Sequence, residues 1–467
     1  MLHGQDAGQD RPSTTRLGGG FAAGAMHVRS QVYHWGDVAR LGLPFGNPAR
    51  SGSTDSRPGG PRLLDLDLSA GPAIVKVCSG SGSIAAFLTV KGQLALLRGN
   101  VDDGQRPVTM VKSWGSIAPG LAVHEFAIGY EAGIALDQHG VVHLWGRLPP
   151  NLSHASPGVI FDADPVLQVA CSDRHAALVA ASGALYTFGS ATGGALGHNS
   201  ETDDLAAPAR VLALHDYHVR SVSCGGTFTA AIVAGDTERD ATKVFTWGIG
   251  CNGRLGHDDL DSRWVPTQVS ALDRASITSI SCGDAHCLAL SALGQVFTWG
   301  DPRHGRLGRP PAQHGAPMPI DTNGARIVQV SAGYDHSAML SSSGALYMFG
   351  SNRRRQLGVP GVHVATPVPV QVAGLEVDQV HCARYHTMVI VHEAGGSTFV
   401  IGPGTPRAVS RDAKRNATAP EDLPVPRPEI RVTDRRHERM GLPSRADFYN
   451  HVVLNDMLSS ALGGSFN

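Results

Sequence analysis

The sequence predicts an all-β fold arranged as a closed ring of small antiparallel sheets. Three observations predict it: a fourteen-residue unit that recurs, a ten-residue segment that precedes the unit, and glycines that mark intervals of about 50 residues. Hydrophobic residues make up 42% of the 467 residues, which is enough for a packed core. The 57 glycines and 29 prolines are typical of many short strands joined by turns.

The fourteen-residue unit is clearest as VFTWGDPRHGRLGR at residues 296–309. Its apolar and aromatic residues favour a strand, and Gly300 ends that strand at a turn or a close approach. A polar loop follows, and Leu307 with Gly308 returns the chain to the interior. Three more copies lie at residues 185–198, 244–257 and 346–359.

The ten-residue segment is clearest as SCGDAHCLAL at residues 281–290. It recurs before the other units, with weaker forms near residues 77–88 and 127–136. Together the two segments predict four short strands in each repeat. In one repeat we expect these strands at residues 265–269, 278–281, 286–290 and 296–299.

Eight glycines that end strands recur along the chain and divide it into seven intervals. They are Gly36, Gly99, Gly146, Gly189, Gly248, Gly300, Gly350 and Gly402. Seven repeats of four strands predict a closed seven-bladed β-propeller with four-stranded antiparallel blades over residues 31–403, because closure protects strand edges that an open array would leave unpaired.

The ends of the chain differ from the repeats. Residues 1–30 are polar and rich in glycine, and we expect a disordered leader. Residues 404–467 are expected to form a Pro/Arg-rich linker and a short C-terminal helix at 446–462, because apolar residues recur there at helical spacing. The linker is interpreted as a solvated tail, and a nuclear import signal is the alternative.

Two segments compete to close the ring. Residues 32–35 are an orphan strand with no preceding partner segment, and residues 397–401 are the last copy's own candidate. We expect residues 32–35 to close the ring. Residues 43–71 are rich in Pro, Gly, Ser and Asp and predict a surface insertion.

The two paired segments resemble the repeat of the regulator of chromosome condensation family. The resemblance rests on Cys282-Gly283 with His286, and on Trp299-Gly300 with Leu307-Gly308, repeated over residues 32–402. WD-repeat and kelch propellers are the competing closed arrays, but the sequence shows no regular Gly-His to Trp-Asp pairing and no kelch-like double-glycine pattern. The resemblance implies a seven-bladed propeller whose ring is closed by an N-terminal strand. It also implies a role resembling that of the founding member, a nucleotide exchange factor for the small GTPase Ran.

Cysteine and histidine recur four residues apart, at Cys171 and His175, at Cys282 and His286, and at Cys382 and His386. Zinc binding is one interpretation. However, the same two positions hold Ala332 and His336 in another copy, and Cys224 and Phe228 in a further one. We therefore expect a structural role, and we predict no metal and no cofactor.

Chemistry and partners are constrained by what the sequence lacks. It contains no nucleophile elbow, no phosphate-binding loop and no apolar run of about 18 residues. The net charge of −1 gives no electrostatic argument for nucleic acid. The seven cysteines show no disulfide spacing and favour a reducing compartment. We expect a non-enzymatic monomer in the cytoplasm, with the nucleus and mitochondria as alternatives.

Partner-binding residues are predicted in the loops and turns, where blades expose variable positions. The loops supply a basic rim and the turns supply two aspartates: Arg254, Arg303, His304, Arg306, Arg353, Arg354, Arg355, Asp284 and Asp335. Dispersed solvated charge and ordinary turn residues are the alternative interpretations. Two functions stay open, a regulatory or scaffold propeller that binds another protein, and an exchange factor for a Ras-like small GTPase.

Overall fold

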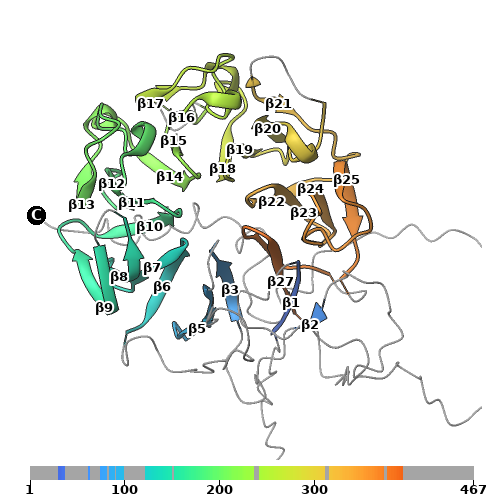
Figure 1. The fold of residues 1–467 in the computed structure, drawn as a ribbon, viewed down its shortest axis with the longest axis horizontal. Helices are drawn as coiled ribbons and strands as arrows, with labels where there is room; N and C mark the ends of the chain where they lie inside the picture. Colours follow the sequence, from blue (N-terminus) through green and yellow to red (C-terminus); the bar gives the residue numbers. More distant parts are fainter. Residues whose placement is uncertain are drawn as a thin grey trace, which may run out of the picture.

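The computed structural model describes residues 30–36, 62–63, 74–80, 84–89, 91–98, 121–149, 152–235, 241–310, 315–372 and 376–392. These residues form antiparallel sheets that follow one another around a central axis, six of four strands and one of three (Figure 1). The predicted all-β propeller with four-stranded blades is confirmed for six sheets. The sheet β3-β4-β5 has three strands within the described residues, so six of the seven expected four-stranded blades are observed there.

The first strand of each blade lies nearest the axis, and the second pairs with it. The first strands are β3 (Ile74–Ser79), β6 (Val123–Ile128), β10 (Val166–Cys171), β14 (Val219–Cys224), β18 (Ile277–Cys282), β22 (Ile327–Ala332) and β26 (Gln379–Cys382). The second strands are β4 (Ile84–Thr89), β7 (Glu131–Asp137), β11 (His175–Ala180), β15 (Phe228–Val233), β19 (His286–Ser291), β23 (His336–Ser341) and β27 (His386–His392).

The third and fourth strands complete the blades toward the outside. The third strands are β5 (Leu94–Arg98), β8 (Val142–Leu148), β12 (Leu185–Gly189), β16 (Lys243–Gly248), β20 (Val296–Gly300), β24 (Leu346–Ser351) and, in the last blade, β1 (Ser30–Gly36). The fourth strands are β9 (Leu152–Phe161), β13 (Leu205–Arg210), β17 (Arg263–Gln268), β21 (Met318–Pro319), β25 (His363–Val370) and β2 (Arg62–Leu63).

Short 3₁₀ turns follow several third and fourth strands. They are η2 (Thr192–Gly194), η3 (Leu212–Leu214), η4 (Cys251–Gly253), η5 (Ser270–Leu272) and η6 (Arg303–Gly305). The described part of the chain has no α-helix, and hence none that could cross a membrane. The predicted leader, linker and C-terminal helix lie outside the described residues.

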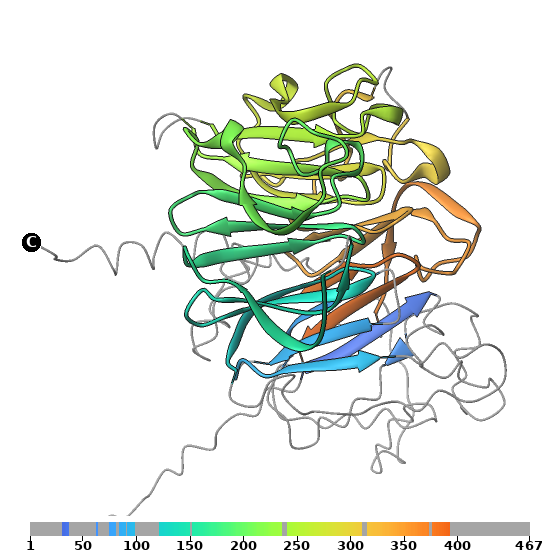
Figure 2. The same ribbon diagram turned by 60° about the vertical axis from the view of Figure 1, so that its left-hand side comes forward.

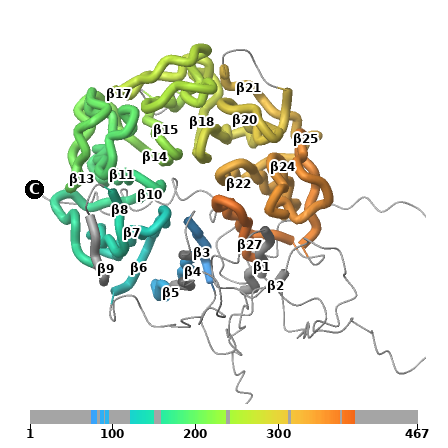
Figure 3. Tube along the Cα trace, in the orientation of Figure 1, coloured from blue at the N-terminus to red at the C-terminus, as the bar shows by residue number. Residues whose placement is uncertain are grey.

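The hydrophobic core lies between neighbouring blades. One cluster joins Phe228 and Ile232 of one blade to Ile280 and Trp299 of the next, all of them buried. Every residue of β11, β15, β19 and β23 is buried, because a second strand is covered by a blade on each side. Successive blades follow one another from β3 to β27 in Figure 3 and stack side by side in Figure 2.

An N-terminal strand closes the ring. Strand β1 pairs antiparallel with β27, with Val32 opposite Ile390 and Trp35 opposite Thr387. The prediction that residues 32–35 close the ring is thus confirmed, and residues 397–401 lie outside the described residues. The insertion predicted at 43–71 also contains β2, whose Leu63 pairs with Tyr33. Strand β2 has only two residues, which is too short for an alternation of apolar and polar residues, so the sequence did not predict it.

Candidate functional site

The candidate site lies where the first and third strands of the blades end. In an antiparallel sheet these two ends are on the same side, so the turn after the first strand and the loop after the third strand share one face. We call this side the loop face. The predicted arginines and His304 lie in the loops, whereas Asp284 and Asp335 lie in the turns. The fold therefore places all the predicted residues on the loop face.

A completely buried histidine ties one blade to the next beneath this face. The Nε2 of His175 lies 2.8 Å from the Oγ1 of Thr229 in the neighbouring blade. That hydroxyl donates a 2.8 Å hydrogen bond to the carbonyl oxygen of Ala195, which lies in a loop of the blade that contains His175. Its single proton is used there, so His175 is the donor to Thr229. The same relay recurs through His286, Ser337 and Arg306, and through His336, Thr387 and Gln356.

Burial keeps these histidines neutral. It lowers the pKa of His175 to about 4. Burial, with a smaller contribution from His381, lowers the pKa of His336 to about 3. Neutral imidazoles with Nε2 protonated are the form that the relay needs.

One blade interface replaces the relay by an apolar contact. Phe228 occupies the position that is histidine in four other blades, and Cys287 occupies the position that holds the accepting hydroxyl in the three relays. Both side chains are completely buried in one core cluster, and the Cys287 sulfur lies 3.9 Å from the carbonyl oxygen of Arg254. The two positions differ together, which indicates that the histidine and the hydroxyl act as one structural unit.

Glycine in the turns allows the blades to approach closely. A Cβ atom at Gly283 would lie 2.3 Å from the carbonyl oxygen of Gly333 in the next blade and 2.4 Å from the His286 ring. At Gly333 the corresponding distance to the carbonyl oxygen of Ala383 would be 2.4 Å. Gly283 and Gly333 are therefore required by the close packing of neighbouring blades.

Arg306 joins two blades on the loop face. Its Nη2 lies 2.6 Å from the Oδ1 of Asp335 in the next blade, and its Nη1 lies 3.7 Å from the Oδ2 of Asp301. Asp301 also accepts a 2.8 Å hydrogen bond from the Nε of Arg303. Burial raises the pKa of Asp301, but the hydrogen bonds from Arg303 and the charge of Arg306 outweigh it and lower the pKa. Asp301 is therefore an ionised anchor for the loop.

Two arginines and two tyrosines form a cluster beside Arg306, which we call the arginine–tyrosine cluster. The guanidinium of Arg384 lies 4.6 Å from the ring centre of Tyr334 and 5.2 Å from that of Tyr385. Arg354 lies 5.6 Å from the Tyr385 ring, and the two rings are 5.9 Å apart. Contacts at these distances are cation–π and aromatic interactions. Three neighbouring turns and loops are thus joined at one point.

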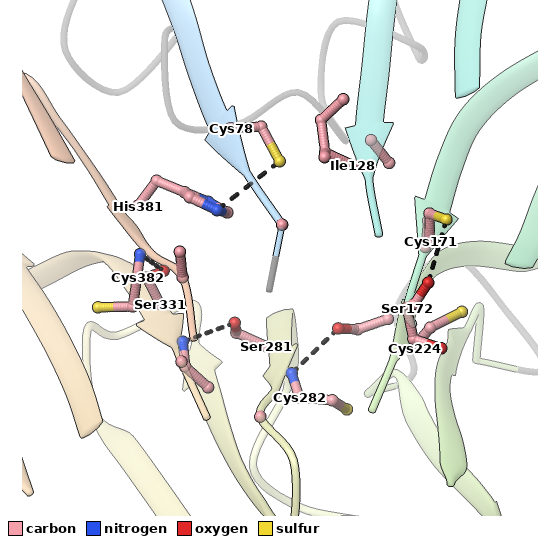
Figure 4. Close-up of a pocket in the computed structure, with 18 of the residues that line it drawn as sticks. Cys78, Ile128, Cys171, Ser172, Cys224, Ser281, Cys282, Ser331, His381 and Cys382 are labelled. Atoms are coloured by element: carbon pink, nitrogen blue, oxygen red, sulfur yellow. Dashed lines mark hydrogen bonds between the residues drawn. The ribbon is translucent and has the colours of Figure 1, made fainter. Parts of the chain in front are cut away.

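The cluster lies at the mouth of the central channel. Arg384 reaches across the channel, and its Nη1 is 3.6 Å from the Oδ2 of Asp173. Asp284 also lines the mouth, and burial raises its pKa against the nearby charges of Arg254 and Arg306. Behind the mouth is a cavity of about 310 Å³, lined by the ends of the first strands (Figure 4).

The structure separates the predicted residues into two groups. Arg254 and Arg306 are 9% and 2% exposed. Arg254 donates to the carbonyl of Cys251 at 3.0 Å and thereby holds its own loop. These two arginines support the loops, so the exposed basic rim is narrower than the sequence suggests. The other predicted residues are exposed or half-buried: Asp284, Arg303, His304, Asp335, Arg353, Arg354 and Arg355.

Tyr334, Arg384 and Tyr385 were not predicted. They occupy the variable positions between the glycine or alanine and the histidine of the turn segment, as in Gly-Tyr-Asp-His and Ala-Arg-Tyr-His. Variable positions inside a repeated frame are those that packing leaves free. The same reasoning that selects the loop residues would have found these three.

In the repeat with Cys282 and His286, the two side chains contact other groups and do not form a common metal site. His286 is used in the relay to Ser337, and Cys282 Sγ lies 3.5 Å from Cys287 Sγ. Among the described residues no group of three potential metal ligands is found.

The chain resembles proteins built on one repeat family. The family model described as the RCC1-like domain matches residues 149–438. Human E3 ubiquitin-protein ligase HERC2 is 33% identical over 196 residues, which cover 40% of this chain and 4% of HERC2. RUG3 of Arabidopsis thaliana, a mitochondrial RCC1 domain-containing protein, is 30% identical over 272 residues, or 53% of this chain and 58% of RUG3. The matches thus span less than two thirds of either relative.

Solved structures share the fold. Prp20p of Saccharomyces cerevisiae aligns with a TM-score of 0.65 at 17% identity, over 79% of this chain and 94% of Prp20p. Human WBSCR16 aligns with a TM-score of 0.64 at 19% identity, over 78% of this chain and 98% of WBSCR16. Both likenesses concern the propeller architecture.

Proposed function

Because this chain belongs to the RCC1-like domain family, we propose that it is a protein-interaction propeller, a regulatory or scaffold subunit whose loop face binds a partner protein. The observation that carries the proposal is the arginine–tyrosine cluster at the channel mouth. Arginine and tyrosine are enriched among the residues that supply most of the binding energy at protein interfaces. Here they are held by neighbouring turns and loops on a rigid ring, so little ordering is needed before a partner binds.

The chemistry of the mouth favours a partner that presents oxygen atoms. The Nε of Arg384 is buried and has no hydrogen-bond partner within the described residues. A carboxylate or carbonyl oxygen from a partner would satisfy this donor. Because an unsatisfied buried donor costs about 1 to 3 kcal/mol, satisfying it favours binding.

The exposed loop residues extend the proposed site around the cluster. Arg303 has a side chain that is 68% exposed although it pairs with Asp301. We propose that Arg303, His304, Arg353, Arg354 and Arg355 contact the partner together with Asp284 and Asp335. Arg254 and Arg306 hold the loops in place.

Affinity capture with matched variants tests the proposal. The full-length chain, its Arg384→Ala and Arg354→Ala variants and the opposite-face variant Arg274→Ala are used as bait, and bound proteins are quantified by mass spectrometry. Arg274 is exposed in the connection before β18, on the side away from the loop face. We expect at least one partner that both loop-face variants lose and that Arg274→Ala retains. If every bound protein is retained by Arg384→Ala and Arg354→Ala, the proposal is wrong.

Nucleotide exchange on a small GTPase is the second candidate. It is favoured by the likeness in fold to Prp20p, whose crystal structure is described together with its binding to Gsp1p and histones. An exchange factor binds the nucleotide-free GTPase more tightly than the loaded form. Release of labelled GDP from a panel of Ras-like GTPases tests this candidate, and a panel without acceleration eliminates exchange while leaving a scaffold role intact.

We propose that the protein works in the cytoplasm, with the nucleus and the mitochondria as the alternatives, the latter because RUG3 is described as mitochondrial. Imaging of the full-length chain with a C-terminal fluorescent tag distinguishes the three locations. No catalytic residue is assigned in this proposal.

A further inference from the structure

The central channel contains a cysteine paired with a histidine at the point where the ring closes. Cys78 is the next-to-last residue of β3 in the first blade, and His381 lies on β26 in the last blade. The Sγ of Cys78 is 3.7 Å from the Nε2 of His381 (Figure 4). Both residues line the cavity of about 310 Å³.

Contacts across this seam hold the pair in register. The backbone N–H of Val77 donates a 3.1 Å hydrogen bond to the Oε1 of Gln379. The Nε2 of His381 also lies 3.0 Å from the carbonyl oxygen of Ser79, and the Nε2 of His386 lies 2.8 Å from the Ser79 hydroxyl. The contact with Ser79 holds the imidazole beside the sulfur, and the other two hydrogen bonds hold the two blades in register.

Charge around the pair favours a thiolate and an imidazolium. Burial raises the pKa of Cys78, but the charge and hydrogen bond of His381, the charge of Lys76 and the backbone hydrogen bond from Ile128 outweigh it and lower the pKa. Burial lowers the pKa of His381, but the charge and hydrogen bond of Cys78 outweigh it and raise the pKa. On the neighbouring strand β6, Glu125 is paired with Lys76.

Three other cysteines that line the channel, Cys171, Cys224 and Cys382, provide a comparison inside the same molecule. Burial is the largest cause that raises the pKa of Cys171 and of Cys224, and it raises the pKa of Cys382 to about 12. All three line the same cavity as Cys78. They differ from Cys78 because no neighbouring cation lowers the pKa of their thiols.

We propose that Cys78 and His381 form a reactive thiol site in the central channel, at which small hydroperoxides oxidise Cys78 to a sulfenic acid. The thiolate attacks one peroxide oxygen, an S–O bond forms and the O–O bond breaks. Sulfur loses two electrons and the peroxide gains them. The departing hydroxide takes the proton of the His381 imidazolium and leaves as water; from an alkyl hydroperoxide the departing group is an alkoxide, which takes the same proton and leaves as an alcohol.

The cavity has room for such an oxidant. A water molecule occupies about 30 Å³ in the liquid, so a cavity of about 310 Å³ holds hydrogen peroxide. Thiolates that are stabilised by a neighbouring cation and reached by solvent are the cysteines most susceptible to oxidation.

The test compares cysteines within one protein. The reduced full-length chain is treated with hydrogen peroxide at pH 6.5 in the presence of a dimedone-type probe, which traps sulfenic acids, and peptide labelling is followed by mass spectrometry. We expect Cys78 to be labelled at least about tenfold faster than Cys171, Cys224 and Cys382, because their thiolate fractions are far smaller. Equal or slower labelling of Cys78 would overturn the proposal without any variant being needed.

His381→Gln then tests the role of the imidazole. Its far-ultraviolet circular dichroism and melting curve are first matched to the wild type. We expect Cys78 labelling in this variant to fall about tenfold at pH 6.5 and to recover toward pH 9, whereas the wild-type rate changes little over that range. Parallel pH profiles for a folded variant and the wild type would show that His381 does not activate the thiol. If the variant is unfolded, the comparison among wild-type cysteines decides.

Discussion

Trp299 illustrates how one residue serves two blades. Its completely buried indole donates a 3.1 Å hydrogen bond to the carbonyl of Arg254 in the preceding loop. A Cβ atom at Gly256 would lie 2.9 Å from the indole nitrogen, so this glycine allows the loop to cover the ring. The aromatic residue of one repeat therefore packs directly against the Leu-Gly segment of the preceding repeat.

Replacing this indole should destabilise the fold. We expect Trp299→Ala to lower the free energy of unfolding by about 3 to 5 kcal/mol through a core cavity. Trp299→Phe loses chiefly the hydrogen bond and should cost about 1 kcal/mol beyond the smaller change in packing. Arg303→Ala should stay within about 1 kcal/mol, because the Arg303 side chain is 68% exposed and the buried Asp301 keeps its ion pair with Arg306. Urea unfolding of the three variants measures this order, and a wild-type curve for Trp299→Ala contradicts it.

The histidine relay predicts a non-additive pair of substitutions. Ser337→Ala leaves the buried Nε2 of His286 without its acceptor, and the Nδ1 of His286 already has no hydrogen-bond partner within the part of the chain that the structure describes. We expect a loss of about 1 to 3 kcal/mol. His286→Phe with Ser337→Cys copies the Phe228 and Cys287 pair of the neighbouring interface. The double variant should be more stable than the sum of its single variants predicts, as measured in a double-mutant cycle. Additive losses would mean that the two positions are independent.

The buried histidines make stability depend on pH. The pKa of His175 is lowered to about 4 and that of His336 to about 3, whereas an unfolded histidine titrates near 6.5. Between these values the unfolded chain binds more protons, so stability is full above about pH 7 and falls as the pH drops. Each histidine should cost about 1 kcal/mol at pH 5.5. Urea unfolding at pH 7.5 and 5.5 measures the loss, and equal free energies of unfolding would contradict it.

Residue-level predictions from the sequence worked where a side chain serves its own repeat. Gly300, Trp299 and the structural histidines have the roles that their repetition indicates. Arg254 and Arg306 are buried, because a long side chain can turn back onto its own loop or onto the next blade. The spacing of residues in the sequence does not show which way such a side chain turns. Arg384 reaches Asp173 across the channel, a contact that depends on ring closure.

At the scale of elements, strands of the regular repeats could be predicted almost to the residue. Strands expected at 265–269, 278–281, 286–290 and 296–299 are observed as β17, β18, β19 and β20. The prediction fails in the degenerate copy that ends at Gly146. There β8 continues past Gly146 to Leu148 and pairs with the ten-residue β9, with Leu148 opposite Leu152. Because the Leu-Gly pair is missing after Gly146, the repeat pattern does not predict where the third strand of this blade ends.

Strand β1 is the element on which ring closure depends. It pairs with β27 along its whole length, from Ser30 opposite His392 to Gly36 opposite His386. Deleting residues 1–42 removes this strand and exposes the edge of β27. We expect the melting temperature to fall by several degrees or the transition to lose cooperativity.

A matched deletion provides the control for ring closure. Removing residues 1–28 leaves β1 intact and should leave the melting curve unchanged. If the deletion of 1–42 melts like the wild type, β1 does not stabilise the ring.

At the scale of the whole molecule, rigidity and recognition are separated. Strands, glycines and histidine relays bind blade to blade, while the variable turn and loop positions gather on one face. The arginine–tyrosine cluster is assembled from the turns and loops of neighbouring blades at the channel mouth. A surface of this kind exists only in the closed ring, so partner binding should require the folded chain.

Site-specific photo-crosslinking tests the central claim that this face binds the partner. A photo-crosslinking amino acid replaces Arg303 on the loop face or Leu293, which is 88% exposed in the hairpin on the opposite side. Each full-length variant is irradiated in cell extract, and the adducts are identified by mass spectrometry. We predict that position 303 captures the partner lost in Arg384→Ala and that position 293 does not. Capture of that partner from position 293 alone would contradict the account.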